Sequence, residues 1–249
     1  MREEKLLLFL HLPKTAGTSI NRILLDQYAR QEVVFLHDEA GWSTSRLVDI
    51  CNQRSQELRA VSGHFPFGIH ELVNTPTTYM TFLRHPLELL LSMYHYFLRT
   101  PIIPTSHVVS QLSFAQFVKS QDFDFLTSNL QTRFLCGNPN GFCHRTEVDY
   151  LMWKPGDYTP DLERAKEHLS SHFSFVGITE WSPECFLAMG NLLGWQKTVP
   201  QFRENVTANR PALSTLEQDV LDTLHEKNRL DLQLYEYAKE LYRSRFATR

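Results

Sequence analysis

The stretch that most constrains this fold is residues 10–25, LHLPKTAGTSINRILL, where an apolar run passes through a short polar loop into a helical pattern. Residues 5–12 are predicted to form a buried strand, and Ile20, Ile23 and Leu24 recur at helical spacing. A strand, loop and helix in this order direct backbone N–H groups and the positive end of the helix dipole toward one place. The stretch therefore predicts a site for a phosphate or sulfate.

The side chains of this loop suit an anion as well. Lys14 supplies a mobile positive charge, Thr15, Thr18 and Ser19 supply hydroxyl groups, and Gly17 permits a close backbone approach. The G-x-x-x-x-G-K-[ST] spacing of a nucleoside triphosphate loop is missing. An ordinary loop, with Thr18 or Ser19 as the helix N-cap, would explain the same residues, so the loop alone does not decide its ligand.

Alternation of apolar runs and amphipathic stretches continues along the chain and is typical of α/β folds with a parallel sheet. Further strands are predicted at residues 33–36, 58–62, 78–83 and 173–176. Helices are predicted at residues 43–56, 87–98, 160–171 and 183–193, and two more within 214–242. We expect one domain, residues 1–249, with a P-loop-like central parallel sheet flanked by helices and a helical C-terminal region.

The bulk composition narrows the function classes. The chain has 249 residues and a net charge of −3 from 25 basic and 28 acidic side chains, which argues against a general nucleic-acid binder. The apolar run at residues 6–10 is too short for a signal peptide or a membrane span, and no later segment is long enough to span a bilayer. The sequence thus predicts a cytoplasmic protein without a membrane span.

Four cysteines form no C-x-x-C pair and are expected to be free thiols: Cys51, Cys136, Cys143 and Cys185. Cys136 and Cys143 are close enough in sequence to pair if oxidised. A zinc site that uses both with His144 is a weaker alternative because a fourth ligand is not evident.

A second polar group follows another predicted strand, in Thr81-Phe82-Leu83-Arg84-His85-Pro86. Arg84 is placed at the carboxyl end of that strand, where α/β sheets bind ligands, and Ser92 follows eight residues later in an otherwise apolar helix. An arginine and a hydroxyl at such a place suit a second phosphate. A surface ion pair at Arg84 and a tolerated helical serine are the alternative.

HLPKTAGTS followed by TFLRHPLELLLS resembles the two cofactor motifs of the sulfotransferases that use 3′-phosphoadenosine 5′-phosphosulfate (PAPS). The resemblance is strongest to their carbohydrate branch, which includes heparan sulfate 2-O-sulfotransferase and bacterial relatives. It extends to SFVGITEWSPECFLAMGNLLGW and to the C-terminal region, and so covers most of the chain.

The resemblance implies PAPS as the sulfuryl donor and a set of residues that bind it. The 5′-phosphosulfate loop would comprise Lys14, Thr15, Ala16, Gly17, Thr18 and Ser19. The 3′-phosphate would be bound by Arg84 and Ser92, and a late loop would add Thr207 and Arg210. The acceptor would be a hydroxyl-bearing glycan or small metabolite.

Ser62-Gly63-His64-Phe65 resembles the segment that carries the catalytic base of this family, which implies His64 as that base. The heparan enzyme has a second histidine where this chain has Ser62, and that difference bears on the acceptor. A neutral histidine can accept the proton of an attacking hydroxyl, and Lys14 would stabilise charge on the leaving phosphate oxygen. No metal is required, because the sulfuryl group carries less charge than a phosphoryl group.

The sequence gives less support to other polar residues as parts of the site. His70 is a reserve base, whereas His11 and His85 are expected to be structural. Asn129 and Arg133 would share one helix face, which we expect to be solvated, with contact to the acceptor as the alternative.

Two other functions fit the same loop. A nucleotide kinase or NTPase with an atypical phosphate loop is one, although no metal-binding aspartate is evident. A nucleotide-binding protein that has lost catalysis is the other.

Overall fold

The computed structural model describes residues 5–36, 44–100, 104–137, 159–195 and 212–246. Within these ranges, five strands form one sheet in the order β2-β3-β1-β4-β5, and every neighbouring pair is parallel. The strands are β1 (Leu6–Leu10), β2 (Val33–Phe35), β3 (Ala60–Gly63), β4 (Thr77–Leu83) and β5 (Phe173–Ile178). The predicted central parallel sheet is therefore confirmed, and each strand ends within two residues of its predicted boundaries.

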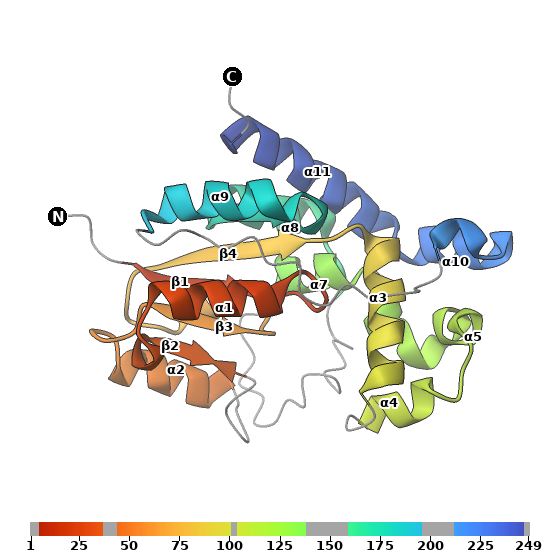
Figure 1. Ribbon diagram of the computed structural model, residues 1–249, viewed down its shortest axis with the longest axis horizontal. Helices are drawn as coiled ribbons and strands as arrows, with labels where there is room; N and C mark the ends of the chain where they lie inside the picture. Colours follow the sequence, from red (N-terminus) through yellow and green to blue (C-terminus); the bar gives the residue numbers. More distant parts are fainter. Residues whose placement is uncertain (1–4, 37–43, 101–103, 138–158, 196–211, 247–249) are drawn as a thin grey trace.

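Helices cover the sheet and extend from its carboxyl edge. Those beside the sheet are α1 (Gly17–Gln27), α2 (Thr44–Gln53), α7 (Leu130–Cys136), α8 (Leu162–Ser171), α9 (Ser182–Leu193) and α11 (Arg229–Phe246). The others are α3 (Pro86–Arg99), α4 (Pro104–Val109), α5 (Phe114–Lys119), α6 (Asp124–Thr127) and α10 (Gln218–Lys227). In Figure 1, α1 lies in front of the sheet and α8 behind it, while α3 stands where the strands end.

The strand β1 is buried from end to end because it lies in the middle of a sheet covered on both faces. Each of its residues is 2% exposed or less. A strand in this position carries apolar side chains on both faces, which explains its uninterrupted run of leucine and phenylalanine. The chain leaves β1 toward β2 and β3, and leaves β4 in the opposite direction toward β5. The carboxyl ends of β1 and β4 thus flank the point where the strand order reverses, which is where α/β sheets bind ligands.

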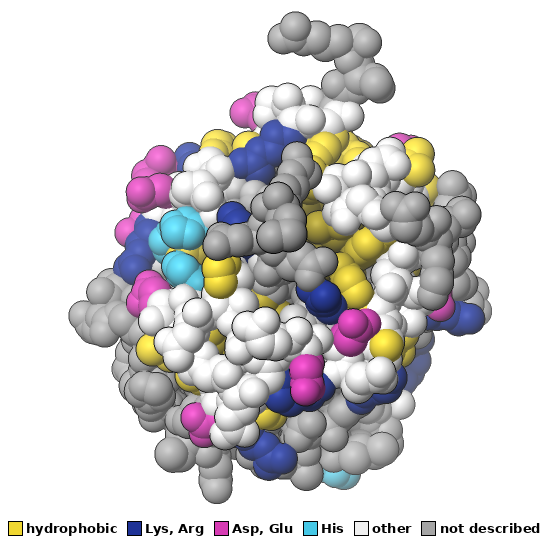
Figure 2. All heavy atoms as spheres, turned by 90° about the vertical axis from the view of Figure 1, so that its left-hand side faces the viewer, with side chains coloured by type: hydrophobic (Ala, Val, Ile, Leu, Met, Phe, Trp, Pro, Cys, Tyr) yellow, Lys and Arg dark blue, Asp and Glu magenta, His cyan; other side chains and the backbone are white. Residues whose placement is uncertain are grey.

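Figure 2 shows the surface of the molecule that lies on the left-hand side of Figure 1. On the described residues of this face, acidic and basic side chains are interspersed among hydrophobic ones. In the ranges that the structure describes, no helix is both long enough and apolar enough to cross a membrane.

Two details of the fold bear on the sequence predictions. The prediction that Thr18 or Ser19 caps α1 is wrong: the N-cap is Ala16, in the left-handed conformation with φ 66°, and no side chain caps this end. Cys136 is a buried free thiol, whereas Cys143 lies outside the described residues, so their pairing stays a prediction.

Candidate active site

The loop between β1 and α1 holds an unusual backbone. Lys14 and Ala16 have φ angles of 64° and 66°, although both carry a Cβ atom. Each such residue costs of order 1–2 kcal/mol, a strain that persists where the surrounding structure imposes it. The first turn of α1 contains no acidic residue. The positive end of the α1 dipole therefore has no anionic side chain in that turn, and the loop suits an anionic ligand.

Gly17 is required here by a neighbouring ring. A Cβ atom at this position would lie 1.7 Å from Nε2 of His11, so any other residue would displace that imidazole. Thr15 is fully buried and its hydroxyl donates to the carbonyl of Leu12 at 2.7 Å. The side chain of Thr15 thus braces the loop from inside, while Thr18 is exposed beside it.

The two sequence motifs meet in space. Nη1 of Arg84 donates to the carbonyl oxygen of Lys14 at 3.1 Å, which joins the ends of β4 and β1. Nη2 of Arg84 also lies 4.0 Å from a carboxylate oxygen of Glu88. The Lys14 ammonium lies 4.3 Å from the ring centroid of Tyr96, on α3. Lys14 and Arg84 belong to separate sequence motifs and are 70 positions apart, and the fold brings these two cations into one site.

The electrostatics of this site favour an incoming anion. Burial lowers the pKa of Lys14 to about 8, and the positive charges of Arg84 and Arg99 add to this effect. Burial also lowers the pKa of Arg84, against the carboxylate of Glu180. A polyanion would relieve the repulsion between these cations, because each gains an opposite charge.

Ser92 lies on the side of α3 that faces the loop. Glu88, Ser92 and Tyr96 are spaced four residues apart and so form one stripe along the helix. The first contacts Arg84 and the last contacts Lys14, which orients the stripe toward both cations. Ser92 is 8% exposed between them.

His64 is held against the loop by the pairing of β1 with β3. The register pairs Leu10 with Gly63, so the next residues, His11 and His64, emerge side by side. Their rings stack with centroids 4.3 Å apart, and Nδ1 of His64 donates to the carbonyl of His11 at 2.5 Å. In the neutral ring this hydrogen bond places the lone pair on Nε2, the form that can accept a proton. Ser62 is buried, and its hydroxyl donates to Oδ1 of Asn21 at 2.6 Å.

His70 contacts a different part of the sheet from His64, although the two residues are close in sequence. Its Nδ1 is 3.1 Å from the hydroxyl of Tyr79, and its ring centroid is 5.0 Å from that of His172. Tyr79 pairs with Leu8 of β1, three residues before His11, which contacts His64. Burial lowers the pKa of His70, and neighbouring His172 adds to the effect. This geometry does not support His70 as the reserve base.

The solvated helix face expected around Asn129 and Arg133 is wrong. Asn129 accepts hydrogen bonds from the backbone N–H groups of Leu230 and Asp231, and Gln131 is fully buried. The sequence did not indicate a role for Gln131, whose side chain is hydrogen-bonded to both the backbone N–H and the backbone carbonyl of Arg84. The one sign in the sequence was that Gln131 stands among apolar residues of a helical stretch.

Some predicted features lie elsewhere or remain predictions. Thr207 and Arg210 fall outside the described residues. Within the described ranges, no group of three or more His, Cys, Asp or Glu side chains is placed to hold a metal ion.

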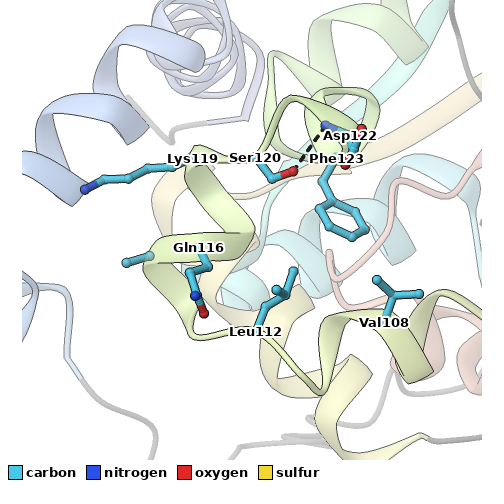
Figure 3. A pocket seen from close by; sticks show the side chains of 8 residues that line it. Val108, Leu112, Gln116, Lys119, Ser120, Asp122 and Phe123 are labelled. Carbon is cyan, nitrogen blue, oxygen red and sulfur yellow. Dashed lines mark hydrogen bonds between the residues drawn. The ribbon is translucent and has the colours of Figure 1, made fainter.

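A separate hollow of about 630 Å³ lies beside α4 and α5, on the other side of α3, and shares no residue with the loop (Figure 3).

Comparisons with known proteins show the family of this chain. The profile described as "Sulfotransferase family" matches residues 1–238. Heparan-sulfate 6-O-sulfotransferase 1 of Homo sapiens is 24% identical over 290 residues, which cover 99% of this chain and 67% of that protein. The same enzyme of Cricetulus griseus is 24% identical over 288 residues, with 99% and 69% covered. The chain belongs to the sulfotransferase family.

Solved structures show the same fold. The crystal structure of mouse sulfotransferase SULT7A1 complexed with PAP has a TM-score of 0.50 and 14% sequence identity, and the match covers 96% of this chain and 89% of that one. At this identity the likeness concerns the fold. The family match over residues 1–238 confirms the family expected from the two motifs, and the reaction class is sulfuryl transfer.

Proposed function

We propose that this chain transfers a sulfuryl group from PAPS to a hydroxyl of a glycan or small-molecule acceptor. The observation that carries the proposal is the meeting of Lys14 and Arg84 beside His64, at the carboxyl ends of adjacent strands. The heparan-sulfate enzymes among the relatives support a glycan acceptor.

The residues present fit a donor with phosphate at both ends. The N-terminal turn of α1 and the ammonium of Lys14 suit the 5′-phosphosulfate, through the loop from Lys14 to Ser19. Arg84 and Ser92 suit the 3′-phosphate, because a guanidinium can bind it through two parallel hydrogen bonds. Thr207 and Arg210 are proposed as further contacts. PAPS would supply an activated sulfuryl group. The residues of the chain would orient that group and accept one proton from the acceptor hydroxyl.

His64 acts as the general base in this mechanism. Its Nε2 takes the proton of the acceptor hydroxyl while the oxygen forms its new bond to sulfur. The bond between sulfur and the 5′-phosphate oxygen breaks, and its electron pair stays on that oxygen. Lys14 and the α1 amides hold the charge that develops there. The carbonyl of His11 keeps Nδ1 protonated throughout, which preserves Nε2 as the accepting atom.

The experiment is sulfuryl transfer from labelled PAPS to a panel of glycan and small-molecule hydroxyls. Binding of PAP (3′-phosphoadenosine 5′-phosphate), the product that PAPS leaves after transfer, is measured in parallel. His64→Ala should lower turnover by roughly 10²–10⁴-fold and leave PAP affinity within about twofold. His70→Ala is the matched control and should keep wild-type turnover. If His64→Ala turns over normally, or if His70→Ala is the inactive variant, the assigned base is wrong.

A further inference from the structure

Gln131 makes two hydrogen bonds to one residue of the site. Its Oε1 accepts from the backbone N–H of Arg84 at 3.0 Å, and its Nε2 donates to the carbonyl of Arg84 at 2.8 Å. The strand pairing of β4 with β5 ends one residue earlier, at Leu83 and Ile178. The amide of Gln131 therefore replaces the missing strand neighbour and satisfies both backbone groups, which would be costly to leave unpaired.

Gln131 is itself fixed by the junction of α7 with α11. The buried carboxylate of Asp231 accepts from the backbone N–H groups of Gln131 and Thr132 at 3.0 and 2.7 Å. It also accepts from the hydroxyl of Thr132 at 2.7 Å. In return, Oδ1 of Asn129 accepts from the backbone N–H groups of Leu230 and Asp231, in the first turn of α11. Each helix thus caps the other, and the start of α7 cannot shift without breaking this junction.

We propose that Gln131 is a positioning residue for Arg84, and that it sets affinity for the 3′-phosphate of the nucleotide. The amide fixes the peptide from which the guanidinium projects toward the Lys14 carbonyl and the α3 stripe. Gln131 is fully buried, and both of the side-chain hydrogen bonds described above are to Arg84. This inference rests on the proposed function, in which Arg84 binds that phosphate.

The test compares two nucleotides, PAP and adenosine 5′-phosphate, which lacks the 3′-phosphate. Gln131→Met keeps the side-chain length and removes both hydrogen bonds to Arg84. It should weaken PAP binding by about tenfold and leave adenosine 5′-phosphate binding unchanged. In an Arg84→Ala background, Gln131→Met should have no further effect on PAP, because the two residues act as one unit.

Gln116 provides a matched control. Its Oε1 accepts from the backbone N–H of Ser113 at 2.8 Å, in a capping box on α5 beside the hollow of Figure 3. Gln116→Met also removes a glutamine bond to the backbone, and it should leave the ratio of the two affinities unchanged. A Gln131→Met protein that loses affinity for both nucleotides equally, or for neither, overturns the positioning role.

Gln131→Glu is the second variant and guards against misfolding of the first. As a carboxylate it keeps the acceptor for the Arg84 N–H but cannot donate to the Arg84 carbonyl, whereas the protonated acid can. Its preference for PAP over adenosine 5′-phosphate should be weaker than that of the wild type at pH 8, where the introduced side chain is a carboxylate. A preference that matches the wild type at this pH contradicts the inference. Failure of the wild type to bind PAP would instead contradict the proposed function.

Discussion

At the scale of single residues, the site is organised around a lysine whose charge is disfavoured until an anion arrives. Lys14 lies over Tyr96, beside the guanidinium of Arg84, and burial with these neighbours lowers its pKa to about 8. A bound phosphate would raise that pKa, because it gives the ammonium an opposite charge. In the proposed function, protonation of Lys14 and binding of the nucleotide are therefore coupled.

This coupling predicts a pH dependence. Since the bound form holds the Lys14 proton more tightly, PAP affinity should fall above about pH 8, by up to about tenfold per pH unit. Lys14→Arg should remove this fall because a guanidinium stays protonated, while Lys119→Arg, far from the loop, should keep it. Calorimetry at pH 7, 8 and 9, in buffers of different ionisation enthalpy, measures the affinity and the proton uptake. An unchanged pH profile in Lys14→Arg would refute the coupling.

At the scale of elements, the sequence predicted the strands, the loop and the start of α3 because each is a local pattern. The apolar run of β1 and the proline at the start of α3 need no distant partner to be interpreted. The junction of α7 with α11 was missed because it joins Asn129 to residues about 100 positions away. A polar residue that is buried by such a partner looks, in sequence, like one that faces solvent.

The α7–α11 junction makes a prediction about stability. Asp231→Asn replaces one carboxylate oxygen with an amino group that faces a buried N–H, so it should lower the free energy of unfolding by roughly 1–3 kcal/mol. Asp219→Asn is the control, because Asp219 is exposed and forms a surface ion pair with Lys119, and it should leave the urea midpoint close to that of the wild type. Equal midpoints for the two variants would show that the junction is not a source of stability.

At the scale of the whole molecule, a site forms where the strand order reverses, between the ends of β1 and β4. Neither motif is decisive alone, and the fold brings them together through the bond from Arg84 to the Lys14 carbonyl. The fold of a family permits many acceptors, and in the proposed function acceptor choice depends on side chains around His64. The motifs of the proposed donor site are local in sequence, whereas the acceptor site has no equally local pattern.

The central claim is that this site binds a nucleotide through both a 5′ and a 3′ phosphate, and thermal unfolding with added nucleotides tests it most directly. A ligand at 100 times its dissociation constant stabilises the folded state by about 2.7 kcal/mol. The account predicts that PAP without a divalent metal raises the unfolding temperature more than adenosine 5′-phosphate does, and more than ATP with Mg²⁺. An ATP–Mg²⁺ shift larger than that of PAP, or no shift with PAP, would contradict it.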